Sequence, residues 1–273
     1  MNAVLTGGVE RVSRAFARAK AEHRLAVIVY LTVGFPDRQS TAALLRAALD
    51  GGADALELGV PFSDPLADGA TVQRAGEQAL RNGIGLVDCL AEARSIVEER
   101  DATAFLMGYT NPFLRYGPAR LADDARGAGL AGIIVPDLPA EESAVLDDAL
   151  VPAGIARIDL YAPTTPNDRL ERLLPRSRGF VYCVSLTGVT GARTALPADV
   201  NAFVARVRER TALPVALGFG IARPEQVASL RGRLDGVVIG SAAIDVVANA
   251  EPSRRPDALR AFVESMVAAG RSD

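Results

Sequence analysis

Two carboxylates, Glu57 and Asp68, flank a loop rich in proline and glycine and have the placement of acid–base groups. Glu57 lies in a short apolar run, residues 55–58, that has the length of a buried strand. A carboxyl group at the end of a buried strand loses hydration, which disfavours its ionised form and raises its pKa. Because such perturbed groups often mark functional sites, the spacing predicts proton transfer here. The alternative is a carboxylate whose oxygens only accept hydrogen bonds from loop N–H groups.

Aromatic residues occupy comparable positions in or just after other apolar runs. Tyr30, Tyr109 and Tyr182 lie in or directly after such runs, and Phe219 stands between two glycines. Tyr30, Tyr109 and Phe219 could line an apolar pocket together with Met107, although each of them alone is more often a plain core residue.

Glycine-rich segments toward the end of the chain predict a phosphate site. Gly220 follows Phe219, and Gly240 precedes Ser241, which could cap a short helix over residues 242–247. A helix N-terminus with exposed N–H groups binds phosphate without lysine or arginine. The alternative is that these glycines only form tight turns.

Residues 188–193 form a loop of small residues in which Thr190 stands beside Gly191. Glycines in a long loop are typical of a lid that could donate N–H groups to a ligand on closing. A disordered surface loop fits the same residues equally well.

The scarcity of other reactive residues narrows the chemistry. Lys20 is the single lysine and precedes the first apolar run, so no Schiff-base lysine stands at a strand end. His23 is the single histidine, and Cys89 and Cys183 are widely separated, so neither a metal site nor a disulfide is expected. Carboxylate and phenol chemistry on a phosphorylated, largely apolar substrate remains.

Eight apolar runs alternate with amphipathic segments along the chain and must position these residues. The runs are continuous, which is typical of parallel strands covered by helices. They span residues 26–33, 55–58, 104–109, 132–135, 155–160, 180–184, 215–218 and 237–239. The amphipathic segments span residues 10–21, 40–50, 72–81, 87–99, 118–127, 141–150, 167–174, 198–210, 224–230 and 255–269.

Eight strand–helix units in 273 residues predict an α/β fold of the closed (β/α)8 type, a TIM barrel, with an extra N-terminal helix at 10–21. The active site of such a barrel lies at the C-terminal ends of the strands, where the candidate residues fall. An open doubly wound sheet is the alternative, but the first strand lacks the Gly-x-Gly-x-x-Gly turn of that fold. No composition shift marks a boundary, so residues 1–273 are expected to form one domain.

The composition argues against several classes of partner. The chain is 49% hydrophobic and 23% charged and carries a net charge of −3, so nothing indicates binding to nucleic acid or to an anionic membrane. The first 20 residues are interrupted by charges and do not resemble a secretory signal, which predicts a cytoplasmic protein.

Residues 57–69, Glu-Leu-Gly-Val-Pro-Phe-Ser-Asp-Pro-Leu-Ala-Asp-Gly, resemble the signature of the tryptophan synthase alpha chain family. Residues 184–191, 218–221 and 240–242 resemble further motifs of the family, in the same order. The resemblance covers most of the chain and implies a (β/α)8 barrel. It also implies a lyase that cleaves indole-3-glycerol phosphate to indole and D-glyceraldehyde 3-phosphate in tryptophan biosynthesis, by a retro-aldol reaction.

The resemblance also implies roles for individual residues. Glu57 would be the general acid and base at indole C3, Asp68 would accept a hydrogen bond from the indole N–H, and Tyr182 would be an auxiliary hydroxyl. Thr190 would meet Asp68 when the lid closes. Tyr30 would line the indole pocket, and Gly191, Gly220, Gly240 and Ser241 would hold the phosphate.

The family works as a complex of two alpha and two beta chains, so a beta chain is the implied partner. The resemblance implies no cofactor in this chain, and pyridoxal phosphate in the beta chain. Two alternatives stay open: a lyase of the same fold that works alone, and a non-catalytic subunit that senses a sugar phosphate.

Overall fold

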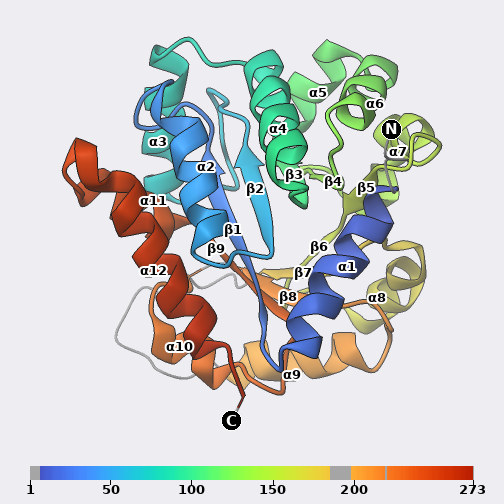
Figure 1. Ribbon diagram of the computed structural model, residues 1–273. Helices are drawn as coiled ribbons and strands as arrows, with labels where there is room; N and C mark the ends of the chain where they lie inside the picture. Colours follow the sequence, from blue (N-terminus) through green and yellow to red (C-terminus); the bar gives the residue numbers. More distant parts are fainter. Residues whose placement is uncertain (1–6, 185–197, 219, 273) are drawn as a thin grey trace, which may run out of the picture.

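The computed structural model describes residues 7–184, 198–218 and 220–272, which form a barrel of strands surrounded by helices (Figure 1). The strands in these ranges are all parallel. They span Ala26–Thr32 (β1), Ala55–Gly59 (β2), Ala104–Met107 (β3), Gly132–Ile134 (β4), Ala156–Ile158 (β5), Leu160–Tyr161 (β6), Val181–Val184 (β7), Val215–Gly218 (β8) and Gly236–Ile239 (β9).

The strand order shows how the barrel closes. It runs β5-β4-β3-β2-β1-β9-β8-β7-β6, and β5 and β6 are separated only by Asp159, so both ends of the order meet in one chain segment. The predicted strand at 155–160 is therefore interrupted rather than continuous. The Asp159 carboxylate accepts hydrogen bonds from Arg157 Nη1 at 2.5 Å and Ser177 Oγ at 2.8 Å. These bonds fix the chain where its pairing changes from β4 to β7.

Helices cover the outside of the barrel. The α-helices span Gly8–Ala21 (α1), Ser40–Asp50 (α2), Ala70–Arg81 (α3), Leu86–Arg100 (α4), Thr110–Tyr116 (α5), Pro118–Gly127 (α6), Ala144–Leu150 (α7), Asn167–Leu173 (α8), Ala198–Arg208 (α9), Pro224–Ser229 (α10), Ser241–Asn249 (α11) and Arg255–Ala269 (α12). Short 3-10 helices span Ala140–Glu142 (η1), Leu174–Arg176 (η2) and Pro252–Arg254 (η3). None of the helices in the described ranges is long and apolar enough to cross a membrane.

The predicted helices are present, and those at 40–50, 118–127 and 255–269 have the predicted bounds. Helix α5 was not predicted, because seven residues are too few to show helical periodicity and Pro112 lies inside them. Its start is fixed by Asp137, whose Oδ1 accepts hydrogen bonds from Thr110 N and Thr110 Oγ1, both at 2.9 Å.

Alternate strand residues face opposite sides of the barrel wall. Along β1, Ile28 and Tyr30 belong to the interior cluster, whereas Val27 and Val29 pack against the helices. Phe16 of α1 also belongs to the interior cluster and lies 5.5 Å from the ring of Phe180. Helix α1 thus closes the interior of the barrel at its N-terminal end.

Asp54 ties α1 to the start of β1 and β2. Its carboxylate is fully buried and accepts hydrogen bonds from Arg24 Nη1 and Nη2 at 2.5 and 2.9 Å, from Arg18 Nη2 at 2.9 Å and from Val27 N at 2.9 Å. The Arg24 side chain is also buried, so this pair lies in a region of low dielectric where a lost partner is costly.

Replacing Asp54 with asparagine should therefore lower the free energy of unfolding by about 3 kcal/mol, because the buried Arg24 guanidinium then keeps only the half-exposed Glu22 as a carboxylate partner. Denaturant titration monitored by circular dichroism measures this change. Asp123→Asn is the matched control, since Asp123 pairs with Arg126 on the exposed surface and should change stability by less than about 1 kcal/mol. Equal effects of the two substitutions would contradict the structural role of Asp54.

Candidate active site

A cavity of about 620 Å³ lies at the C-terminal end of the barrel. Its walls include seven of the residues predicted from the sequence: Tyr30, Glu57, Asp68, Tyr182, Gly220, Gly240 and Ser241. Met107, Val238 and Phe262 add apolar surface. Tyr109 does not line this cavity, and Thr190, Gly191 and Phe219 lie outside the described residues.

Glu57 points into the barrel from the middle of β2, where it is paired with Tyr30 on one side and Phe105 on the other. The residue is 1% exposed, and neither carboxyl oxygen has a hydrogen-bond partner among the described residues. Loop N–H groups in this part of the chain therefore do not satisfy it, contrary to the structural alternative. Burial, and secondarily the charge of Asp68, raises the pKa of Glu57 to about 8. Glu57 is thus a neutral acid at pH 7.

Asp68 lies half-buried at the end of the loop after β2. Burial raises its pKa to about 6, while a hydrogen bond from Tyr109 opposes this rise. Asp68 is therefore mostly ionised at pH 7 while Glu57 is mostly protonated. Two carboxyl groups in one cavity that differ in this way can divide the roles of proton donor and charge stabiliser.

Tyr109 holds the loop that carries Asp68. Its hydroxyl oxygen accepts a hydrogen bond from Ala67 N at 3.0 Å, and its ring stacks on Phe62 with 5.3 Å between centroids. Tyr109 thus supports the loop through Phe62, Ala67 and Asp68, and it is not among the described residues that line the cavity.

Tyr30 and Tyr182 each lie over a glycine of the neighbouring strand. A Cβ on Gly59 of β2 would come within 2.1 Å of Tyr30 Oη, and a Cβ on Gly218 of β8 within 2.5 Å of Tyr182 Oη. Each glycine is paired with the residue two positions after the tyrosine, so only glycine leaves room for the ring. Burial raises the pKa of both tyrosines well above 10, so both hydroxyls stay protonated beside the carboxyl groups.

Backbone N–H groups gather at the other side of the cavity. Helix α11 starts at Ser241 with Gly240 as its N-cap, and no side chain caps it, so the predicted cap by Ser241 of a helix at 242–247 is wrong. The first bond of this turn runs from Ile244 N to Gly240 O at 3.1 Å, which leaves the earlier N–H groups without intrahelical acceptors. These N–H groups can bind an anion.

Gln226 shapes the adjacent loop and was missed from the sequence. Its Oε1 accepts hydrogen bonds from Ala222 N at 2.9 Å and Arg223 N at 3.0 Å, and its Nε2 donates to Gly220 O at 3.4 Å. Gln226 lies three residues after the N-cap of α10, which is the position of glutamine in a capping box, and this spacing could have identified it from the sequence. Gly220 itself adopts φ of +87°, which favours glycine.

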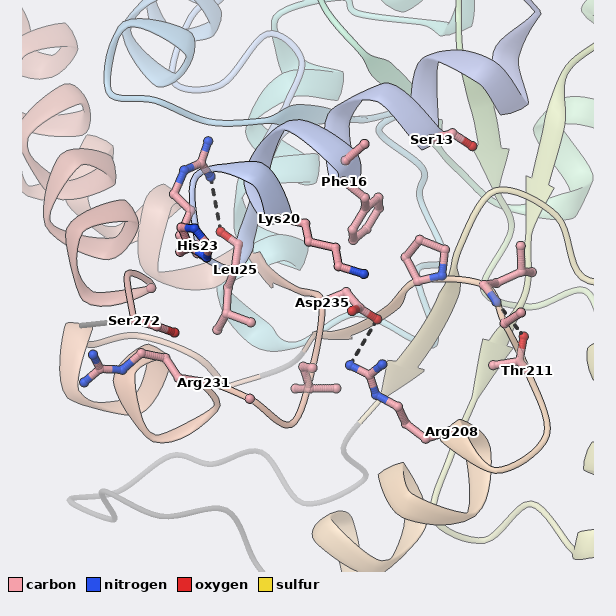
Figure 2. Close-up of a pocket in the computed structure, with 18 residues that line it drawn as sticks. Ser13, Phe16, Lys20, His23, Leu25, Arg208, Thr211, Arg231, Asp235 and Ser272 are labelled. Atoms are coloured by element: carbon pink, nitrogen blue, oxygen red, sulfur yellow. Dashed lines mark hydrogen bonds and ion pairs between the residues drawn. The ribbon is translucent and has the colours of Figure 1, made fainter.

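A second cavity, of about 520 Å³, lies at the N-terminal end of the barrel. Lys20 and His23 line it, so neither lies in the cavity of Glu57. Lys20 extends into it on the same side as Asp235 and Arg208, which form an ion pair at 3.1 Å (Figure 2). The N-terminal end of a barrel is more often important for stability than for catalysis.

The raised pKa of Glu57 predicts a pH-dependent stability. Its protonated form stabilises the fold fully below about pH 4.5, and this contribution is lost as the pH rises to about 8. The glutamine in Glu57→Gln cannot ionise, so the variant escapes this loss. Between pH 5 and pH 8, the free energy of unfolding of the variant minus that of the unsubstituted protein should rise by about 3 kcal/mol. Denaturant titrations of both proteins at each pH measure the difference. A difference that does not vary with pH would contradict the raised pKa.

Comparison with known proteins identifies the family of this chain. The family model described as tryptophan synthase alpha chain matches residues 16–269. The tryptophan synthase alpha chain of Chloroflexus aggregans is 44% identical over 262 residues, which cover 96% of this chain and 98% of that one. The one from Roseiflexus castenholzii is 47% identical over 246 residues, with coverages of 89% and 94%.

Solved structures give the same result. A chain in a structure of Mycobacterium tuberculosis tryptophan synthase superimposes with a TM-score of 0.88 at 36% identity, covering 96% of this chain and 99% of that chain. The tryptophan synthase subunit alpha of Legionella pneumophila has a TM-score of 0.87 at 33% identity, with coverages of 95% and 97%. With matches of this extent in sequence and fold, the chain belongs to the tryptophan synthase alpha chain family.

Proposed function

We propose that the cavity at the C-terminal end of the barrel cleaves indole-3-glycerol phosphate to indole and D-glyceraldehyde 3-phosphate, the alpha reaction of tryptophan synthase. The observation that carries this proposal is the buried Glu57, which has no hydrogen-bond partner among the described residues, whose pKa is raised to about 8 and which faces the same cavity as Asp68. A neutral acid of this kind can protonate a carbon atom of an aromatic ring at neutral pH.

Glu57 would act twice in the reaction. It first gives its proton to C3 of the indole ring, which leaves a positive charge on the ring and a carboxylate on Glu57. The carboxylate then takes the proton of the hydroxyl on the side-chain carbon bonded to C3. The carbon–carbon bond breaks, its electron pair returns to the ring, and the hydroxyl carbon becomes the aldehyde. Glu57 ends protonated, so the cycle balances without a cofactor in this chain.

Asp68 and Tyr182 would support this step. The ionised Asp68 would accept a hydrogen bond from the indole N–H and stabilise the positive charge that develops there. Tyr182, a neutral hydroxyl on the wall of the same cavity, would be an auxiliary group beside Glu57. The aromatic and apolar wall, including Tyr30, would hold the indole ring.

The phosphate would lie at the side of Gly220, Gly240 and Ser241. This is supported by the position of these residues after β8 and β9 and by the N-terminus of α11, which offers N–H donors to an anion. Gly191 and Thr190, which lie outside the described residues, would complete the site and contact Asp68 on closing.

The implied partner is a tryptophan synthase beta chain that carries pyridoxal phosphate, in a complex of two alpha and two beta chains. Residues 61–64 of the loop after β2 would contact the beta chain next to Asp68, which is supported by the exposure of Ser63, Asp64 and Leu66 in this loop. Such docking would order the loop that positions Asp68.

Two further proposals concern the chain as a whole. Residues 1–273 would form a single domain, supported by the pairing of β1 near the start of the chain with β9 near its end. A cytoplasmic location stays a prediction from the sequence.

Glu57→Gln should lower the rate of indole release by at least about 10²-fold, because the amide cannot deliver a proton. The assay follows indole formation from indole-3-glycerol phosphate by the purified chain, alone and with a beta chain. Strong activity that a beta chain does not change would favour the lyase that works alone. Substrate binding without turnover would favour the sensing subunit, and undiminished activity of the variant would exclude the proposed role of Glu57.

The pH dependence of kcat/KM gives an independent test. Activity needs Asp68 ionised and Glu57 protonated, so kcat/KM should rise through about pH 6 and fall through about pH 8. Asp68→Asn should lose most activity, and its profile should lack the rise near pH 6. The fall on the alkaline side of its profile should move to lower pH, because the charge of Asp68 no longer raises the pKa of Glu57. The control Asp123→Asn should keep the unsubstituted profile. A flat profile between pH 5 and pH 9 would contradict this division of roles.

A further inference from the structure

The cavity of Glu57 has an unbalanced distribution of charged groups. Its described lining residues include three acidic residues, Glu57, Asp68 and Asp245, and one basic residue, Arg223. A substrate phosphate carries about −1.5 to −2 charge at pH 7, so Asp68 and Asp245 would repel it, whereas the protonated Glu57 would not. The sequence had suggested a phosphate site made of backbone N–H groups alone.

Asp245 is the acidic residue on the side of the cavity where the phosphate is proposed to bind. It lies in α11, one turn after Ser241, on the wall of the cavity. Thr71 Oγ1 donates a hydrogen bond to its Oδ1 at 3.3 Å, and Arg74 Nη2 stands 3.9 Å from the same oxygen. Both Arg74 and Asp245 are half or more exposed, so this pair offsets the Asp245 charge only weakly.

Arg223 stands where it can compensate. It is the N-cap of α10 with an extended backbone, and it lines the cavity together with Gly220, Gly240 and Ser241. Its backbone N–H is held by Gln226, which is 7% exposed and also binds Ala222 N and Gly220 O. The buried amide of Gln226 thus fixes the backbone from which the guanidinium extends and joins it to the glycine loop.

We propose that Arg223 is the cationic contact for the phosphate group of the substrate, beside the N–H groups of Gly220 and α11. This inference rests on the proposed function, because it takes the phosphate to lie at this side of the cavity. Guanidinium stays charged throughout the accessible pH range and can give two parallel N–H bonds to phosphate oxygens.

The phosphate takes no part in bond breaking and is present in both substrate and aldehyde product. A contact to it therefore strengthens the ground state and the transition state alike, which affects KM rather than kcat. Arg223→Gln should raise KM for indole-3-glycerol phosphate about tenfold, the effect of losing one charge-assisted interaction, with kcat within about twofold.

The experiment compares Arg223→Gln, Arg223→Lys and Arg178→Gln in the full chain. Arg178 precedes β7 at the opposite end of the barrel and is exposed, so its substitution removes one charge away from the cavity. Steady-state kinetics give KM and kcat, and calorimetry gives the affinities for glycerol 3-phosphate and for indole, with thermal melts to confirm folding. The glutamine variant should bind glycerol 3-phosphate about tenfold more weakly and indole normally, and lysine should restore part of the loss.

Glycerol 3-phosphate affinity and KM within twofold of the unsubstituted protein would overturn the inference, as would an equal loss in Arg178→Gln. A fall in kcat at constant KM would also overturn it. Failure of the proposed function is distinguishable, since the unsubstituted protein would then release no indole while the calorimetric comparison still decides the role of Arg223.

Discussion

The burial of the Glu57 carboxyl group inside a closed ring of strands is the constraint on which the site depends. The carboxyl group is buried, neither oxygen has a hydrogen bond among the described residues, and Asp68 shares the cavity. Glu57 therefore stays protonated at pH values at which an exposed glutamate is ionised. A barrel makes this possible because alternate residues of each strand must point inward, whatever their chemistry. Burial disfavours the ionised form of this carboxyl group, so the group keeps a proton that it can donate at neutral pH.

The same closure explains the aromatic and glycine residues around Glu57. Tyr30 and Tyr182 can lie in the interior only because the neighbouring strands carry Gly59 and Gly218 at the crossing points. Their buried hydroxyls stay protonated and therefore add no charge beside Glu57. Phe16 of α1 packs into the barrel interior at the opposite end, so the cavity that contains Glu57 opens on the C-terminal side.

The cavity divides its chemistry between separate parts of the chain. The loop after β2 brings Asp68, and Tyr109 of the β3–α5 connection holds this loop through Ala67. The segments after β8 and β9 bring Gly220, Arg223 and the start of α11. The residues proposed for proton transfer and those proposed for phosphate binding thus lie on elements far apart in sequence.

The sequence by itself determined the barrel, because continuous apolar runs separated by amphipathic helices leave few other ways to bury both faces of each strand. It also determined that Glu57 and Asp68 would lie near each other, since both flank one strand-end loop. Only the tertiary structure decided how exposed each group is, that the fifth strand breaks at Asp159, that Tyr109 supports a loop, and that Arg223 reaches the cavity. These properties come from contacts between residues distant in the chain, and a linear pattern carries no information about which side chains meet or how much water stays between them.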